Sequence, residues 1–169
     1  MRRLASLLTA VLALLAAAPD ARAAGAVLVM NSAAASLSVL DMATLRETRR
    51  IPVLREPHHW ALTPDGRDLL VGDTVGNELL FLDPVTFALR RRLPVADPYQ
   101  LGFSPDGKFL VVNGLARAQI DIYDAGTYAL VKRFKIKSMP SHMDFSPDSA
   151  VVYISLQGTG RLVAIDLRR

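Results

Sequence analysis

The sequence predicts an all-β fold in which a module of four short antiparallel strands is repeated along the chain. Three markers recur at a common spacing of 41 or 42 residues, which indicates a structural repeat. Apolar segments that end in aspartate close at Asp41, Asp83, Asp124 and Asp166. Turn segments that start with Ser or Thr followed by Pro-Asp begin at Thr63, Ser104 and Ser146. Isolated prolines recur at Pro57, Pro98 and Pro140.

Residues 1–23 have the pattern of a secretory signal peptide. Two arginines near the start are followed by the apolar segment 4–18 and then by Ala21-Arg22-Ala23, whose small residues a signal peptidase reads. An uncleaved anchor helix is the alternative, but the apolar segment is short for a span of about 20 residues. We therefore expect cleavage after Ala23, no transmembrane segment in the mature chain, and a periplasmic or secreted protein.

The charge balance argues against a nucleic-acid partner. The 169 residues carry 20 basic and 16 acidic side chains, a net charge of +4. Removal of residues 1–23 takes away three arginines and one aspartate, which leaves +2 with the charges scattered. The one tight basic run, Arg90-Arg91-Arg92, is expected on a solvated outer strand. Because the chain has no cysteine, disulfides, thiolate nucleophiles, covalently attached c-type haem and cysteine-ligated metal sites are excluded.

The module that starts at Pro57 shows the expected strands most completely. They cover about Trp60–Leu62, Leu69–Gly72, Leu79–Leu82 and Ala88–Val95, and all four are rich in Val, Leu or Phe. A Pro-Asp-Gly turn separates the first two strands, since Pro presets φ and Gly tolerates positive φ. Pro, Gly or Asp returns about every ten residues, which is incompatible with helices of ordinary length.

A four-stranded unit of about 40 residues is typical of a β-propeller blade. A single blade has two apolar faces, and only neighbouring blades can cover both. We expect a signal peptide at 1–23 and a repeat domain at 24–169, with blade parts 26–56, 57–97, 98–139 and 140–169. Large apolar residues that should pack between blades recur at Trp60, Leu101 and Met143, and at Leu62, Phe103 and Phe145.

The fold is therefore predicted to be a partial β-propeller with two full blades flanked by two incomplete ones. The repeated sequence begins at the second strand of a blade, at Val27, and stops after the third strand of another, at Asp166. Propellers of this kind close with more blades, and an open arc would expose blade faces and strand edges. We expect that the chain is the N-terminal part of a longer protein. The alternative is self-association of two or more copies.

The repeated sequence resembles the bacterial YVTN-type β-propeller repeat. The resemblance lies in Val27–Asn31, Phe109–Asn113 and the segments of the form Pro-x-x-apolar-x-Phe-Ser-Pro-Asp-Gly. The chain lacks the Gly-His and Trp-Asp dipeptides of WD-type blades. The resemblance implies an exported protein. It implies a binding or scaffold propeller, a relative of the haem-binding propeller of periplasmic nitrite reductases, or a lactonase-like enzyme.

Candidate site residues follow the repeated prolines. They are His58-His59, Tyr99-Gln100 and Ser141-His142, in segments expected to link the outermost strand of one blade to the innermost strand of the next. Such segments lie at the mouth of the central channel. His59, Gln100 and His142 share one repeat position and should surround that mouth.

Several roles are open for these residues. His59 and His142 could ligate a divalent metal, serve as an axial haem ligand or act as general bases. The alternative is that they hydrogen-bond the loops. Asp144, two residues after His142, could orient that imidazole or hold a neighbouring backbone. Trp60 and Arg117 complete the predicted ligand-binding rim, with Arg117 in a loop that could pair an anionic ligand. The aspartates present in every module are expected to stabilise turns.

Two functions follow from the sequence. The first is an exported, non-catalytic scaffold that binds a small ligand or a protein partner at the channel mouth, without a cofactor. The second is a propeller that holds haem or a divalent metal through His59 and His142, as a redox or hydrolytic protein. No glycine-rich phosphate loop, nucleophile elbow or His-x-x-x-His pair is present. We therefore expect a binding protein rather than an enzyme.

Overall fold

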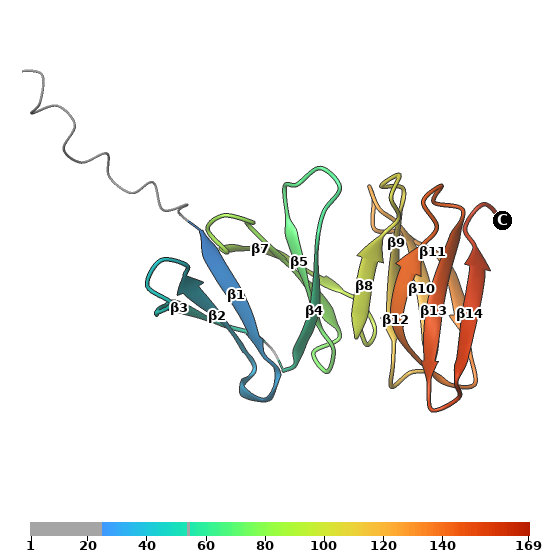
Figure 1. Cartoon of the computed structure of the whole chain (residues 1–169), viewed down its shortest axis with the longest axis horizontal. Coiled ribbons are helices and arrows are strands. Elements are labelled where there is room, and N and C mark those ends of the chain that lie inside the picture. The colour runs from blue at the N-terminus through green and yellow to red at the C-terminus, as the bar shows by residue number, and fades with distance from the viewer. Residues whose placement is uncertain (1–24, 54) are drawn as a thin grey trace, which may run out of the picture.

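Four antiparallel β-sheets make up the computed structural model, which describes residues 25–53 and 55–169. The sheets lie side by side in chain order, as Figure 1 shows. The predicted signal peptide at 1–23 lies outside the described residues. Within the described part, no helix is long and apolar enough to cross a membrane.

The sheets contain three, four, four and three strands, as predicted, and the strands follow chain order in each. The first sheet consists of β1 (Ala26–Asn31), β2 (Ser36–Asp41) and β3 (Glu47–Pro52). The second consists of β4 (Pro57–Leu62), β5 (Leu69–Asp73), β6 (Glu78–Leu82) and β7 (Leu89–Pro94). The third consists of β8 (Gln100–Phe103), β9 (Phe109–Gly114), β10 (Gln119–Asp124) and β11 (Leu130–Lys135). The fourth consists of β12 (Met139–Phe145), β13 (Val151–Gln157) and β14 (Arg161–Asp166).

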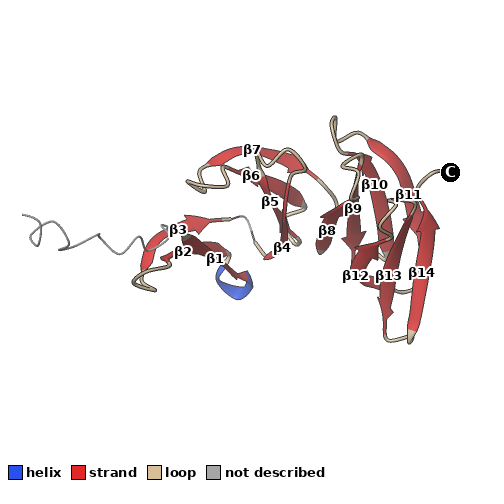
Figure 2. Cartoon of the chain, turned by 45° about the horizontal axis from the view of Figure 1, so that its top comes forward, coloured by secondary structure: helices blue, strands red, loops and turns tan. Residues whose placement is uncertain are grey.

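A single short 3-10 helix, η2 (Ser32–Ala34), interrupts this all-β architecture in the described residues. It lies between β1 and β2 and is the one blue element in Figure 2. The first hairpin has the same pairing register as its counterparts: Leu28 pairs with Val39, and Leu70 pairs with Phe81, each 42 residues further along. Asn31 pairs with Ser36 at the end of β1, whereas Asn113 pairs with Ile120, one position before the end of β9. The two asparagines, which share a motif position, therefore lie one strand position apart.

Each pair of neighbouring sheets encloses one apolar cluster, which confirms the predicted role of the repeat. On β5, Leu69 and Val71 belong to the cluster shared with the first sheet, while Leu70 belongs to the cluster shared with the third. Alternate residues of a strand point to opposite faces, so one central strand contributes to two interfaces. The cluster between the third and fourth sheets is built from Val111, Ile120, Ile122, Val152, Ile154, Ile165 and Leu167.

The innermost strand of the second sheet is longer than predicted. It begins at Pro57 rather than at Trp60, and its pairing with β5 shifts between Pro57 and Trp60. The pairing of β12 with β13 shifts in the same way between Pro140 and Met143. The residues after these two prolines are therefore bulged strand residues and not a separate linker. Such a bulge inserts residues that the partner strand leaves unpaired.

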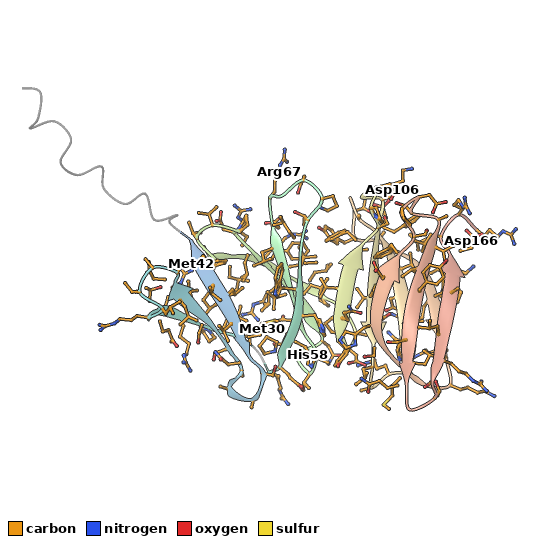
Figure 3. The ribbon with its side chains drawn as sticks, viewed as in Figure 1. Met30, Met42, His58, Arg67, Asp106 and Asp166 are labelled. Carbon is orange, nitrogen blue, oxygen red and sulfur yellow. The ribbon has the colours of Figure 1, made fainter. Side chains whose placement is uncertain are left out.

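The repeated aspartates stabilise turns, as expected. Asp65 accepts hydrogen bonds from the hydroxyl of Thr63 (2.7 Å) and the backbone N–H of Arg67 (3.1 Å). Asp83 accepts the backbone N–H groups of Val85 and Thr86. The Pro-Asp turns lie at one end of the sheets. Figure 3 labels Arg67 and Asp106 at that end and His58 at the opposite end.

Candidate functional site

Four ring side chains from three sheets meet at the end of the sheets opposite the Pro-Asp turns. We name His58, His59, Tyr99 and His142 the histidine–tyrosine cluster. The ring centroids of His58 and Tyr99 are 4.1 Å apart, and those of His59 and His142 are 5.4 Å apart. His58 and His59 belong to β4, Tyr99 precedes β8, and His142 belongs to β12. These residues are far apart in the sequence, and the side-by-side packing of the inner strands brings them together. Figure 3 shows His58 at this end of the sheets.

The hydrogen bonds of His59 fix which ring nitrogen carries its proton. Nδ1 of His59 lies 2.7 Å from the backbone carbonyl oxygen of Tyr99. A carbonyl oxygen only accepts, so Nδ1 of His59 carries the hydrogen and donates it. Nδ1 of His58, 2.9 Å from the same nitrogen, then faces it as an acceptor. With the hydrogen on Nδ1, a neutral His59 carries its lone pair on Nε2.

His142 is held by a polar chain within the fourth sheet. The amide of Gln157 donates to the Ser141 hydroxyl (3.0 Å), which lies 2.8 Å from Nδ1 of His142. The backbone N–H of His142 donates to the Ser155 hydroxyl (3.1 Å). A Ser141 hydroxyl that accepts from Gln157 can donate to Nδ1 of His142, and the ring hydrogen of a neutral His142 is then on Nε2. The imidazole itself is exposed.

The environment of the cluster favours neutral imidazoles in β4. Burial lowers the pKa of His58 below its ordinary value, and the carboxylate of Glu56 acts in the opposite direction. Burial also lowers the pKa of His59, partly offset by the hydrogen bond to the Tyr99 carbonyl. The neighbouring His142 adds to the lowering at both residues. At neutral pH the two side chains therefore act as uncharged donors and acceptors.

A buried amide is hydrogen-bonded to the residues that flank the cluster. Asn113, on β9, is fully buried, and its Nδ2 donates to the carbonyl oxygen of Ser141 (2.9 Å) and to Oε1 of Gln100 (3.4 Å). Its Oδ1 is the one buried side-chain acceptor in the described residues that has no hydrogen-bond partner. Gln100, a predicted rim residue, thus contacts the buried amide of Asn113.

Arg117 lies beside the cluster, at the loop between β9 and β10. Its backbone N–H donates to Oδ2 of Asp97 (2.8 Å), and its guanidinium donates to Oδ1 of Asn77 (3.0 Å). Together with Tyr99 these residues line a depression of about 330 Å³. Burial raises the pKa of Asp97, against the hydrogen bond from Arg117. Tyr99 is therefore shared between the cluster and the depression.

Trp60 does not join the other predicted rim residues. It is 53% exposed and lines a separate apolar depression between β1 and β4. Two positions along β4 from His58, it lies further from the end of the strand where the cluster forms. Asp144 does not hydrogen-bond to an imidazole either; its carboxylate accepts the backbone N–H of Phe145 (2.8 Å).

The donor set limits the metal chemistry of this cluster. Among residues 25–53 and 55–169, no group of three or more His, Cys, Asp or Glu side chains has the arrangement of a metal site. A divalent ion held by three or four protein ligands therefore does not fit. A single imidazole ligand fits better, since metal-ligating histidines commonly donate the other ring N–H to a backbone carbonyl, as His59 does.

Two residues of this site were missed in the sequence: Asn113 and Gln157. Ser141 was named with His142 after a repeated proline, but no role was assigned to it. Asn113 follows the apolar residues of β9, but the position of an asparagine in the sequence does not reveal whether its side-chain oxygen is buried or exposed. Gln157 reaches Ser141 through strand pairing, which the sequence does not display.

Comparisons with known proteins agree on the fold. Kuenenia stuttgartiensis hydrazine synthase is 24% identical with a TM-score of 0.70, over 85% of this chain and 43% of that one. The Cps50 (Swd1) β-propeller domain of Myceliophteria thermophila is 16% identical with a TM-score of 0.64, over 84% of this chain and 50% of that one. The chain thus spans half or less of either structure, and both likenesses concern the fold alone.

No curated protein matches the sequence. The family model of the YNCE-like beta-propeller matches residues 2–169. That match covers nearly the whole chain, and the four sheets with their shared apolar clusters have the architecture it requires. The chain belongs to the YNCE-like β-propeller family.

Proposed function

We propose that this chain is an exported, non-catalytic propeller of the YVTN type that binds a small polar ligand at the histidine–tyrosine cluster. The observation that carries the proposal is the meeting of four ring side chains from three sheets, with His59 and His142 at 5.4 Å between centroids. Residues that occur in only one or two modules contribute little to a repeat, so their convergence indicates a binding role. A protein partner at the same surface is the alternative occupant.

The chemistry of the cluster supports a ligand with both donor and acceptor groups. The Nε2 lone pair of His59 accepts, and Nε2–H of His142 donates. Tyr99 connects both to the depression that holds Arg117 and Asp97. Sites for such ligands commonly combine aromatic side chains with a small number of polar groups of the protein that fix the orientation of the ligand. None of the three imidazoles is hydrogen-bonded to a carboxylate in the described part of the chain, which is the support that a catalytic base commonly has.

Native mass spectrometry of the protein purified from its own compartment tests the proposal. We expect a bound small molecule as added mass, in the wild type and in a Lys108→Ala control at the opposite end of the sheets. In the double variant His59→Ala/His142→Ala the bound fraction should fall by about tenfold or more. Equal occupancy in the double variant, or no added mass in any form, would contradict the proposal.

Haem binding is the second candidate, and the orientation of His59 favours it. Nδ1 of His59 is already bonded to the Tyr99 carbonyl, so Nε2 is oriented to serve as an axial ligand. Titration with haem distinguishes this candidate by absorption. A one-to-one Soret band that is lost in His59→Ala would support it, and unspecific absorption that is equal in the variant would exclude it.

Export is tested on the chain itself. If residues 1–23 are a cleaved signal peptide, the protein recovered outside the cytoplasm should begin at Ala24. An intact N-terminus on the exported protein would contradict cleavage at that position.

A further inference from the structure

A polar pocket lies between the second and third sheets, at the end that carries the Pro-Asp turns. It has a volume of about 370 Å³ and is lined by the turn between β4 and β5, by Arg91 on β7 and by Tyr128 in the loop between β10 and β11. Arg67, which belongs to the first of these turns, is labelled at this end in Figure 3. Both sheets contain four strands, so the pocket lies between two complete modules. The histidine–tyrosine cluster is at the opposite end.

The guanidinium of Arg91 lies against aromatic rings and has unused hydrogen-bond donors. Its Cζ is 3.6 Å from the centroid of the Phe81 ring and 5.0 Å from that of the Tyr128 ring. Arg90 and Arg92, its neighbours on β7, form ion pairs with carboxylates. In the described part of the chain, Arg91 forms neither an ion pair nor a hydrogen bond of its side chain. Its N–H groups are therefore available to an anionic group of a ligand.

Two aspartates of the pocket have carboxylate oxygens that accept no hydrogen bond from the described residues. Asp68 accepts from Nη1 of Arg90 at Oδ1 (2.8 Å), which leaves Oδ2 unused. Asp65 accepts at Oδ1 from the hydroxyl of Thr63 and the backbone N–H of Arg67. Its Oδ2 is 3.5 Å from Nε of Arg67, an ion pair without a hydrogen bond. The pocket thus offers acceptors as well as the donors of its arginine.

The hydroxyl of Tyr128 is close to both kinds of charge. Burial raises the pKa of this hydroxyl, the guanidinium of Arg91 lowers it, and the carboxylates of Asp68 and Asp65 raise it. Such effects need charges at short range. The ring of Tyr128 packs edge-on against Phe81, with the centroids 5.0 Å apart, while the hydroxyl has no hydrogen-bond partner among the residues that the structure describes. It can therefore donate to the same ligand as Arg91.

Two of these residues are polar at repeat positions that are apolar in other modules. Asp68 shares its position with Phe109 and Val151. Tyr128 shares its position with Phe87, and both residues have a positive φ, 58° and 54°, which confirms that the positions are equivalent. The repeat does not require a carboxylate or a hydroxyl at these places. Their presence in the loops around one pocket indicates a role in binding.

We propose that this pocket binds a small zwitterion of the α-amino acid class. Two arginines and two aspartates line it, so a ligand that carries one charge of each sign and no net charge fits best. The carboxylate of the ligand accepts from the guanidinium of Arg91 and the hydroxyl of Tyr128. The ammonium group donates to the carboxylates of Asp65 and Asp68. This surface differs from that of the proposed function, so either can fail alone.

Calorimetric titration with leucine tests the inference, because two matched probes each lack one of its charges. Isocaproate lacks the ammonium group, and isoamylamine lacks the carboxylate. We expect saturable binding of leucine to the full chain. Each of the other two probes should bind about tenfold more weakly or not at all, since it leaves one set of charged partners unsatisfied.

Variants of the pocket locate the binding. Arg91→Gln should weaken leucine binding by about tenfold, and Tyr128→Phe by about threefold. Tyr128→Phe is compatible with the fold, because Phe87 occupies the same position one module earlier. Arg49→Gln is the matched control, since Arg49 stands at the repeat position of Arg91 but donates to the backbone carbonyl oxygen of Thr86. It should bind leucine as the wild type does.

Two further variants keep the outcome decisive. Arg91→Lys retains the charge and loses the planar fork, so it should weaken binding even if Arg91→Gln folds poorly. No heat of binding with leucine, equal binding of isocaproate or isoamylamine, or unchanged affinity in both Arg91 variants would overturn the inference. Binding that is lost in His59→Ala/His142→Ala but kept in the Arg91 variants would also overturn it. That last result would place leucine at the histidine–tyrosine cluster and leave the proposed function standing.

Discussion

At the scale of single residues, the hydrogen bond between His59 and the Tyr99 carbonyl organises the site. It determines the proton position on His59 and, through the contact between the two Nδ1 atoms, on His58. Protonation of His58 would put an N–H on each side of that contact. Both rings are therefore suited to a neutral state, in agreement with their lowered pKa values.

The two lowered histidine pKa values predict a loss of stability in mild acid. In the unfolded chain these imidazoles take up a proton near pH 6.5, before the folded chain does. The free energy of unfolding is therefore highest above that pH and falls as the pH decreases toward the folded pKa values. Urea unfolding at pH 7.5 and 5.5 measures this, with His58→Asn/His59→Asn as the comparison because asparagine does not titrate. An identical pH dependence in the variant would contradict the prediction.

The turn aspartates predict a second loss at lower pH. Hydrogen bonds from Thr86 and Val85 lower the pKa of Asp83 to about 2. An unfolded aspartate has a pKa near 3.9, so the stabilisation is present above that value and is lost as the pH falls toward 2. Asp83→Asn should be less stable than the wild type at pH 6 and should show a weaker pH dependence between pH 4 and 2. Thermal unfolding across this range measures both, and an unchanged slope would argue against the assignment.

At the scale of elements, the close approach between neighbouring sheets depends on a residue without a side chain. Gly72 lies on β5, and a Cβ at this position would be 2.4 Å from the backbone carbonyl oxygen of Pro98. A backbone atom cannot move aside as the end of a side chain can. The Pro98 segment that leads into Tyr99 is therefore positioned by a glycine on the preceding sheet.

Gly72→Ala should destabilise the protein by about 1–3 kcal/mol, because the added methyl group forces the second and third sheets apart. Gly126→Ala is the matched control, since its Cβ would meet only Oδ1 of Asp124 at 3.5 Å. The control should change the free energy of unfolding by less than about 0.5 kcal/mol. Chemical denaturation measures the free energy of unfolding of both variants. Equal losses in Gly72→Ala and Gly126→Ala would contradict the close approach at Gly72.

The elements also show what the sequence could and could not predict. The 41- or 42-residue register predicted the number of strands in each sheet, because turn residues and apolar strands repeat in the text. The bulges after Pro57 and Pro140 were not predicted, since a bulge depends on the pairing of two strands and not on one. For the same reason His58 and His59 were expected in a linker, whereas they lie on β4.

The candidate site was predicted in part. The shared repeat position of His59 and His142 led to the expectation of a common rim, and the structure brings these two together with His58 and Tyr99. Trp60 was grouped with them because it was interpreted as a residue particular to one module, but it lines the apolar depression beside β1 instead. The hydrogen-bond network through Ser141 and Asn113 joins different sheets, and no local sequence pattern predicts it.

At the scale of the whole molecule, stability is shared between neighbouring sheets. Each central sheet contributes to two apolar clusters, and no cluster lies within one sheet. Such an arrangement resembles a repeat array, in which the interfaces between units supply much of the stability. Loss of one interface residue should therefore weaken the array as well as its own sheet.

Leu70→Ala tests this sharing. Leu70 is fully buried between the second and third sheets, so its truncation should cost about 2–5 kcal/mol. Leu162→Ala, at a position that is 70% exposed, should cost less than about 0.5 kcal/mol. The free energies of unfolding of the two variants provide the comparison. A small effect of Leu70→Ala would indicate that the second and third sheets are not packed together.

The meeting of three sheets at one cluster is tested most directly by nuclear Overhauser effects between imidazole rings. His59 and His142 belong to sheets two positions apart in the array, yet their ring centroids lie 5.4 Å apart. Side-by-side stacking of the sheets predicts a cross-peak between the carbon-bound ring protons of these two residues. Rings that each show contacts within their own sheet, but none with the other, would contradict both the stacking and the site.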